Sequence, residues 1–262
     1  MIAKPMIVAN WKMQVDIDAS MTMARALVEV YVANRQAYSL VLCPSFVNIP
    51  GVSKALLHTE IGLGAQDVGS INRGARTGDV SVLDLHTLGC AYCIVGHSER
   101  RLYHGEIDEQ VHEKVLTCVR LGIVPVVCVG ETRNERSEQK TQAVVTRQLR
   151  AALSDVPMGP KTRILIAYEP VWSISPGTPA VPEQVEEVFV LIRNEVRESA
   201  IPAPLVKVLY GGSVNSSTVS GFMNYTSADG FLVGSESQEP ARFISLLNTI
   251  TLIQRRVESQ TR

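Results

Sequence analysis

The chain has 262 residues, of which 45% are hydrophobic and 19% are charged, and its formal net charge is −1. This length and composition are enough to bury a sizeable core, as one large or two small domains. A net charge so close to zero provides no field that would attract nucleic acid or an anionic membrane. No apolar run approaches the roughly 20 residues of a membrane-spanning helix, and the N-terminus does not resemble a signal peptide. We therefore expect a protein that binds neither nucleic acid nor membrane.

The first predicted elements are short apolar runs that recur along the chain. They are rich in Val, Ile and Leu, and near-continuous runs of this kind are typical of strands buried on both faces of a parallel sheet. The predicted strands lie at residues 6–10, 40–44, 61–66, 92–97, 124–130, 164–169, 206–212 and 230–234.

Longer segments with helical spacing lie between these runs, at residues 18–32, 137–156 and 182–199. The last of them opens with Pro182 and acidic residues, which is a helix-start signal. No low-complexity linker interrupts the series, so we expect a single domain over residues 1–262. Eight strand-then-helix units in a chain of this size match a (β/α)₈ barrel. An open doubly wound sheet is the alternative when only the alternation of strands and helices is considered.

Polar residues gather where several of the predicted strands end. These positions are Asn10 to Lys12, His97 to Glu99, Glu169, Tyr210 to Ser213, and Gly234 with Ser235. In an open sheet the first and eighth strands lie far apart, whereas in a closed barrel all the C-terminal strand ends face one mouth. The pattern therefore favours the barrel, with a Lys, a His, a Glu and two Gly/Ser turns converging on a small ligand.

The five cysteines are Cys43, Cys90, Cys93, Cys118 and Cys128. Cys90 and Cys93 form a CxxC pair, but a metal site would need a second pair of ligands, and the sequence offers none. Buried free thiols are the better interpretation. We expect no metal site.

The stretch "AYEPVWSISPGTPA" (167–180) ends an apolar strand on a carboxylate, Glu169, and continues into a short loop that is stiff at both ends. One interpretation is a catalytic base beneath a lid. Taken alone, the stretch is explained more simply by a structural Glu at a strand end, beside an ordinary Pro-rich turn.

Six motifs change this interpretation, because together they resemble triosephosphate isomerase, in order and over nearly the whole chain. They are "NWKM" (10–13), "GARTGD" (74–79), "VGHSERR" (95–101), "CVGET" (128–132), "AYEPVW" (167–172) and "YGGSV" (210–214). The resemblance implies a TIM barrel that interconverts dihydroxyacetone phosphate and glyceraldehyde 3-phosphate through an enediol, as in glycolysis and gluconeogenesis. It also implies a cytoplasmic homodimer that uses neither a metal nor an organic cofactor.

By the same resemblance, the catalytic residues are Lys12, His97 and Glu169. The reaction needs a base and an electrophile, and we expect burial to raise the pKa of Glu169 and a following helical turn to keep His97 neutral. The resemblance assigns phosphate or substrate contacts to Asn10, Lys12, Ser175, Ser213, Gly234 and Ser235. Supporting residues beside the site are Ser98, Glu99 and Cys128, with Asn10 and Glu99 orienting Lys12 and His97.

The chain departs from the family pattern in three places. The usual lid "AIGTGKTA" reads "SISPGTPA", with changes at Ser175, Pro176, Thr178 and Pro179. The usual "GGASL" reads "GSESQ", which puts Ser235 and Glu236 at the phosphate rim, and "GAQNV" reads "GAQDV" at Asp67. Three hypotheses remain: a triosephosphate isomerase, a related isomerase of a four-carbon tetrulose phosphate, and a catalytically idle barrel serving as a scaffold. The intact catalytic residues argue against the third.

The long loop 67–82 bears on assembly. In the family that the motifs resemble, this loop inserts into the neighbouring subunit. We therefore expect a homodimer in which Thr77 lies near Asn10 of the other chain. Arg76 makes this part of the expected interface more polar than is usual in the family.

Overall fold

The structure is a computed structural model that describes residues 4–157, 159, 162–174, 179–199 and 201–260. Each predicted strand is found within a few residues of its expected bounds. The strands are β1 (Met6–Asn10), β2 (Ser39–Cys43), β3 (Gly62–Ala65), β4 (Tyr92–Val95), β5 (Val124–Val129), β6 (Ile164–Tyr168), β7 (Val206–Tyr210) and β8 (Gly230–Val233).

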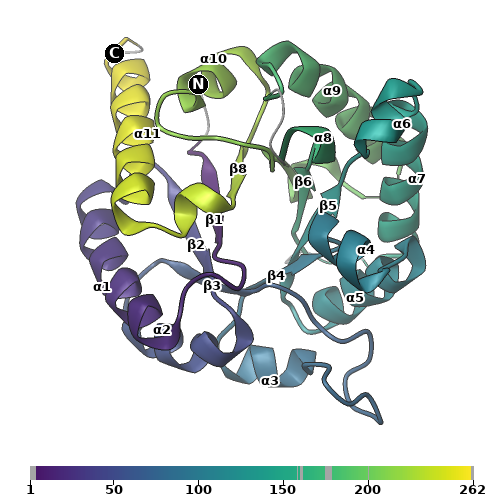
Figure 1. Ribbon diagram of the computed structural model, residues 1–262, viewed down its shortest axis with the longest axis horizontal. Helices are drawn as coiled ribbons and strands as arrows, with labels where there is room; N and C mark the ends of the chain where they lie inside the picture. Colours follow the sequence, from purple (N-terminus) through teal and green to yellow (C-terminus); the bar gives the residue numbers. More distant parts are fainter. Residues whose placement is uncertain (1–3, 158, 160–161, 175–178, 200, 261–262) are drawn as a thin grey trace.

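The strands form one closed parallel barrel in sequence order (Figure 1). Closure is provided by β1, which pairs in parallel with both β2 and β8, for example through Ile7 opposite Leu40 and Phe231. The open-sheet alternative is therefore wrong. Because the strands are parallel, their C-terminal ends all open at one mouth.

Apolar side chains form two separate cores, one on each face of the barrel wall. Met6 and Val8 of β1 belong to a cluster with inward-facing residues of the other strands, whereas Ile7 and Ala9 belong to the larger cluster shared with the helices. This alternation follows from the two-residue period of a strand. Burial on both faces explains why the strands are near-continuous apolar runs.

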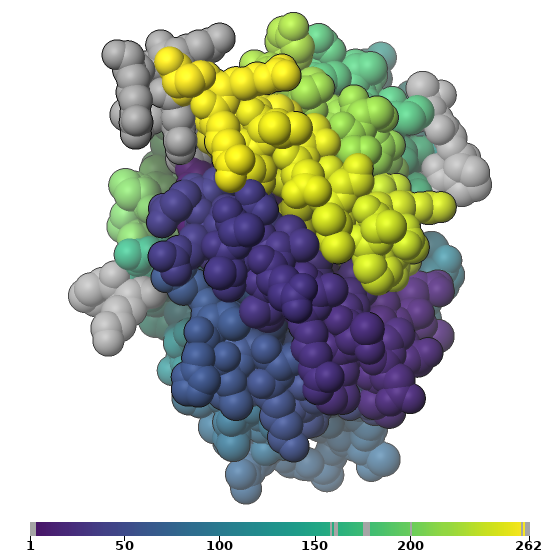
Figure 2. Space-filling view, turned by 90° about the vertical axis from the view of Figure 1, so that its left-hand side faces the viewer, coloured from purple at the N-terminus to yellow at the C-terminus, as the bar shows by residue number. Residues whose placement is uncertain are grey.

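Helices surround the barrel in a ring (Figure 1). They are α1 (Ile17–Asn34), α2 (Ile49–Ala55), α3 (Val82–Thr87), α4 (Ser98–His104), α5 (Asp108–Arg120), α6 (Arg133–Ser137), α7 (Thr141–Leu153), α8 (Val171–Ile174), α9 (Pro182–Glu198), α10 (Val219–Tyr225) and α11 (Pro240–Gln260). Figure 2 shows α1 and α11 side by side, where the end of the chain packs against its beginning. None of the described helices is long and apolar enough to cross a membrane.

One predicted helix boundary is wrong. The segment 137–156 is not one helix, because α6 ends at Ser137 and α7 begins only at Thr141. Between them, Gln139 adopts a left-handed backbone with φ of 56°, which a right-handed helix cannot contain. No Gly or Pro announces this break in the sequence. All five cysteines are buried and free, as predicted.

Candidate active site

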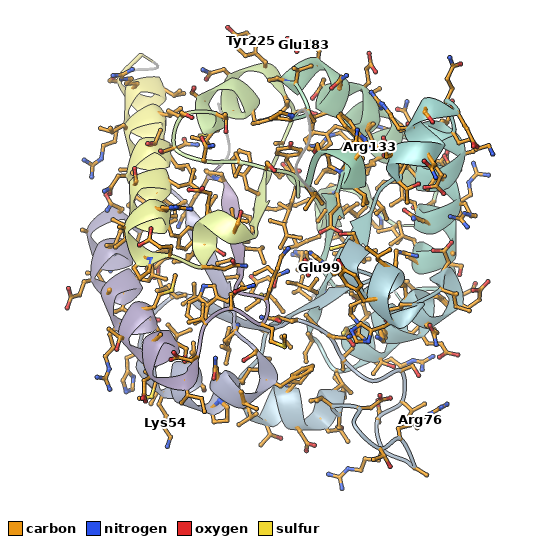
Figure 3. All side chains as sticks on the ribbon, in the orientation of Figure 1. Lys54, Arg76, Glu99, Arg133, Glu183 and Tyr225 are labelled. Carbon is orange, nitrogen blue, oxygen red and sulfur yellow. The ribbon has the colours of Figure 1, made fainter. Side chains whose placement is uncertain are left out.

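A cavity of about 120 Å³ opens at the C-terminal ends of the strands. The turns that follow β1, β4, β6, β7 and β8 all contribute to it, and Glu99 is labelled near this mouth in Figure 3. The lining residues are Asn10, Lys12, His97, Glu169, Ile174, Gly211, Gly212, Ser213, Val214, Leu232, Gly234, Ser235 and Glu236. The predicted catalytic residues therefore lie together, although they are up to 157 positions apart in the sequence.

Glu169 is fixed at the floor of the cavity and is 2% exposed. Its Oε1 lies 3.0 Å from His97 Nε2, and its Oε2 accepts a 2.8 Å hydrogen bond from the backbone N–H of Ser98. The backbone beneath it is held just as closely. A Cβ on Gly130 would lie 1.8 Å from the Glu169 carbonyl oxygen, so only glycine fits there.

The expected raised pKa of Glu169 is wrong for the ligand-free site. Burial does raise the pKa of this carboxyl, but the facing His97 ring and the Ser98 N–H stabilise the carboxylate more strongly, and the net direction is downward. The expectation considered burial alone, and the nearby donors reverse it. The carboxylate is therefore ionised at neutral pH and ready to accept a proton.

His97 stands at the first turn of α4, where its Nδ1 accepts the backbone N–H of Glu99 at 3.2 Å. An accepting Nδ1 must carry a lone pair, so the ring proton lies on Nε2, facing Glu169. Burial is the largest single influence on the pKa of His97 and lowers it, but the charge and hydrogen bond of Glu169, together with the charge of Glu99, outweigh burial, and the net direction is upward. Displacement of the Glu169 carboxylate by substrate removes the larger part of this raising effect, while burial and the helix N-terminus continue to favour neutral imidazole.

Lys12 is held in an unusual backbone conformation after β1, with φ of 50°. Its N–H bonds to Asn10 Oδ1 at 3.1 Å, and its carbonyl accepts Gln66 Nε2 at 2.9 Å. Its Nζ contacts Glu99 Oε1 at 2.6 Å. A left-handed lysine is rare and persists only where its surroundings enforce it. The predicted orienting partners Asn10 and Glu99 are thus both in contact with Lys12.

Backbone N–H groups surround the other end of the cavity. Among the described residues, those of Gly212, Ser213, Gly234 and Ser235 have no hydrogen-bond partner. Unpaired N–H groups in tight turns form an anion-binding surface. Ser175, the remaining predicted contact, lies outside the described residues, as do Pro176 and Thr178.

Glu131 is a functional candidate that our sequence reasoning missed. It is fully buried, and its Oε1 accepts Trp172 Nε1 at 2.9 Å and Thr141 Oγ1 at 3.2 Å, while the Tyr168 hydroxyl contacts both carboxylate oxygens at 3.2 Å. The Arg136 guanidinium lies 5.0 Å from the Trp172 ring centroid. Glu131 lies two residues after β5, within the motif "CVGET", and this position was the feature of the sequence that could have identified it. It anchors the segment that follows Glu169.

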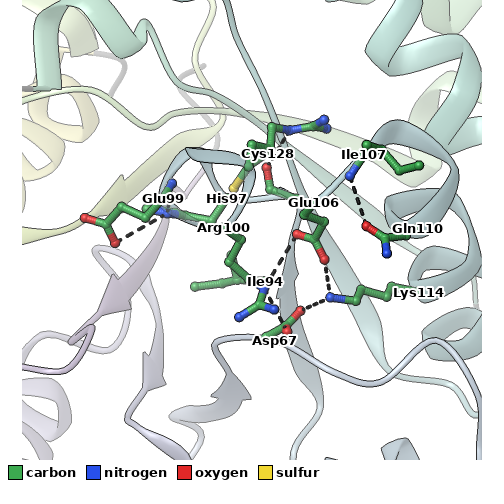
Figure 4. Close-up of polar contacts among 12 residues, drawn as sticks. Asp67, Ile94, His97, Glu99, Arg100, Glu106, Ile107, Gln110, Lys114 and Cys128 are labelled. Carbon is green, nitrogen blue, oxygen red and sulfur yellow. Dashed lines mark hydrogen bonds and ion pairs between the residues drawn. The ribbon is translucent and has the colours of Figure 1, made fainter. Parts of the chain in front are cut away.

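Asp67, flagged as a departure from the family pattern, belongs to a buried ionic cluster behind α4 (Figure 4). Its carboxylate contacts Lys114 at 2.7 Å and Arg100 at 2.8 Å, and Lys114 also pairs with Glu106. Burial raises the pKa of Asp67, and the Lys114 ammonium opposes this only in part. Within the described parts of the chain, no three His, Cys, Asp or Glu side chains are placed to hold a metal ion.

Of two other predicted residues, Cys128 is buried inside the barrel and Thr77 is exposed at the surface. Cys128 is buried inside the barrel, and burial, followed by the Glu169 charge, raises the pKa of its thiol, which makes it a poor nucleophile. Thr77 is exposed in the loop between β3 and α3, which projects from the ring of helices near the labelled Arg76 in Figure 3. This loop borders a second cavity of about 700 Å³.

Comparison with known proteins agrees with this geometry. The family model described as "Triosephosphate isomerase" matches residues 5–250. Proteins named triosephosphate isomerase from Pelobacter propionicus and Cupriavidus necator are 41% and 39% identical over 93% of this chain and 98% of their own length. The protein of that name from Aquifex aeolicus is 38% identical, over 92% of this chain and 98% of its own. The chain belongs to the triosephosphate isomerase family.

Proposed function

We propose that this protein is a triosephosphate isomerase that interconverts dihydroxyacetone phosphate and D-glyceraldehyde 3-phosphate, the reaction named by its relatives. The observation that carries the proposal is the convergence of Lys12, His97 and Glu169 on one cavity with unpaired N–H groups at its other end. The reaction moves a proton between adjacent carbons through an enediol or enediolate. Its place would be in glycolysis and gluconeogenesis.

Glu169 is the proposed base. Its carboxylate is ionised in the free site, and the substrate must replace the contacts with His97 Nε2 and Ser98 N–H. A carboxylate that loses two donors in a site shielded from water becomes a stronger base, because its charge is no longer compensated. The proton taken from one carbon is then returned to the neighbouring carbon.

His97 is the proposed electrophile, because its Nε2–H faces the cavity while Nδ1 is occupied by Glu99 N–H. A neutral ring donates to the developing enediolate oxygen and stabilises it as charge forms. Triosephosphate isomerase is itself a known example of a histidine kept neutral for this purpose, so the role is carried over from the family. Lys12 supplies positive charge, and Glu99 holds its ammonium in place until substrate binds.

The phosphate is proposed to bind at the turns after β7 and β8. The N–H groups of Ser213, Gly234 and Ser235 have no hydrogen-bond partner among the described residues, and all three residues line the cavity. Fixed N–H groups in such turns bind phosphate oxygens without requiring a cluster of cations. Ser175 remains a proposed further donor, and Asn10 a proposed substrate contact through its place beside Lys12.

A coupled assay with three-carbon and four-carbon sugar phosphates tests the proposal. We expect kcat/KM for glyceraldehyde 3-phosphate to exceed that for any tetrulose phosphate by at least about 10²-fold, since a site shaped for one substrate discriminates at this scale. A preference for the four-carbon substrate would replace the proposal with the related isomerase. Absence of turnover with all of these substrates would leave the scaffold hypothesis.

We further propose a cytoplasmic homodimer. Large apolar side chains are exposed on the segments after β1, β2 and β4, namely Met13 (93% exposed), Val47 (71%) and Tyr103 (74%). These segments follow β1, β2 and β4, and Thr77 lies in the loop after the intervening strand β3, so all four residues belong to one side of the barrel, and exposed apolar side chains are common at protein interfaces. The proposed contact joins Thr77 to Asn10 of the other chain.

A further inference from the structure

The rim of the candidate active site carries one charge that the proposed reaction does not use. Glu236 lines the cavity within η3 (Ser235–Ser237), the short 3₁₀ helix that follows β8. It is half-buried, and its carboxylate makes no hydrogen bond or ion pair with any described residue. It stands beside Gly234 and Ser235, whose N–H groups have no hydrogen-bond partner within the described part of the chain.

The other charges of the cavity leave Glu236 without a counterion. Lys12 is already paired with Glu99 at 2.6 Å, and His97 and Glu169 form a pair with each other at 3.0 Å. On α11, which packs against η3, Arg242 is engaged by Glu239 at 3.6 Å. A carboxylate that forms no ion pair with any described residue therefore lies next to the donors that would bind a phosphate, and the Lys12 ammonium, 3.7 Å from where a Cβ on Gly234 would stand, is bound to Glu99 instead.

We propose that Glu236 determines which protonation state of a phosphate ester the protein binds, by coupling phosphate binding to the uptake of a proton. This inference rests on the proposed function, which identifies this end of the cavity as the phosphate site. A phosphate dianion and the Glu236 carboxylate repel each other. The repulsion disappears when one proton is shared between a phosphate oxygen and a carboxylate oxygen, and the pair then forms a hydrogen bond.

The direction of the pH dependence follows from this coupling. A neighbouring negative charge raises the second pKa of a bound phosphate ester. A phosphate ester has a second pKa of about 6, so the complex takes up a proton over a pH range in which the free ligand is already a dianion. With the carboxylate and the dianion about 5 Å apart between charge centres, as the shared proton requires, their repulsion in a solvent-filled cavity lowers the affinity by at least about tenfold at low salt.

The test uses sn-glycerol 3-phosphate, which carries the phosphate but has no carbonyl group to isomerise. Its dissociation constant is measured by calorimetry from pH 5.5 to 8.5, in two buffers of different ionisation enthalpy. The proteins compared are the wild type, Glu236→Gln, Glu236→Asp and Glu239→Gln. The last variant makes the same charge change three residues away, at a side chain that does not line the cavity.

We expect Glu236→Gln to bind about tenfold tighter than the wild type at pH 8, with the ratio falling toward one near pH 5.5 and with fewer protons taken up. Glu236→Asp and Glu239→Gln should retain the wild-type proton uptake. Equal affinities and equal proton uptake in the wild type and Glu236→Gln would overturn the inference while leaving isomerase activity intact. If no variant binds the ligand and none isomerises triose phosphate, the proposed function fails as well.

Discussion

Glu131 offers a direct test of how the segment after β6 is held. The proposed change is Glu131→Gln, which keeps the size of a fully buried side chain and removes its charge. The amide oxygen can still accept from Trp172 Nε1, but the NH₂ group must turn towards the Tyr168 hydroxyl, and the ion pair with Arg136 at 3.4 Å is lost.

The size of the effect follows from these contacts. A hydrogen bond to a charged acceptor contributes about 1 kcal/mol more than one to a neutral acceptor, and two or three such bonds are affected. Since a neutral amide is also less costly to bury, we expect the free energy of unfolding to fall by about 2 kcal/mol in total. For a chain of this size that loss corresponds to a fall in Tm of about 4–8 °C.

Differential scanning calorimetry gives the Tm. A change in tryptophan emission reports on Trp172, which contacts Glu131, because the other tryptophan, Trp11, is buried elsewhere in the protein. Glu138→Gln is the matched control. Its ion pair with Lys140 is exposed, so we expect no measurable change in Tm. A Glu131→Gln protein with wild-type Tm and unchanged emission would show that the carboxylate does not anchor Trp172, and the reasoning would be refuted.

The barrel itself could be predicted because its signals are local. Each strand is an apolar run, and Lys12, His97 and Glu169 stand directly after such runs, so parallel order alone brings them to one mouth. The break at Gln139 could not be predicted in this way. A left-handed backbone at a residue other than Gly leaves no compositional mark.

Contacts between distant residues account for the remaining failures. Glu131 is explained by Tyr168 and Trp172, which lie 37 and 41 positions away, and nothing near it in the sequence reveals these donors. The direction of the Glu169 pKa likewise depends on a 3.0 Å approach of His97 from another strand end. The apolar run before Glu169 indicates that its carboxyl is buried, but no feature of the sequence indicates the contact with His97 that outweighs the effect of burial on its pKa.

Three further predictions concern the base, the assembly and the ionic cluster. Glu169→Asp withdraws the carboxylate by about 1 Å and should lower kcat by at least about 10²-fold, while sn-glycerol 3-phosphate binding persists; near-wild-type turnover would show that Glu169 is not the base. Sedimentation should give a homodimer that Thr77→Arg weakens, and a monomeric, fully active wild type would contradict this. Asp67→Asn tests the raised pKa of Asp67, which is caused by burial. Because the folded-state pKa lies above the unfolded value of about 3.9, the protonated group favours folding below that pH, and this contribution is lost as pH rises through the folded pKa. Stability relative to the Asn variant should therefore fall as pH rises across this window, measured by urea unfolding from pH 4 to 7. The exposed Asp79→Asn should show no such trend. A difference between wild type and Asp67→Asn that stays constant with pH would mean that the carboxyl does not titrate in this window, and that Lys114 and Arg100 keep it ionised throughout.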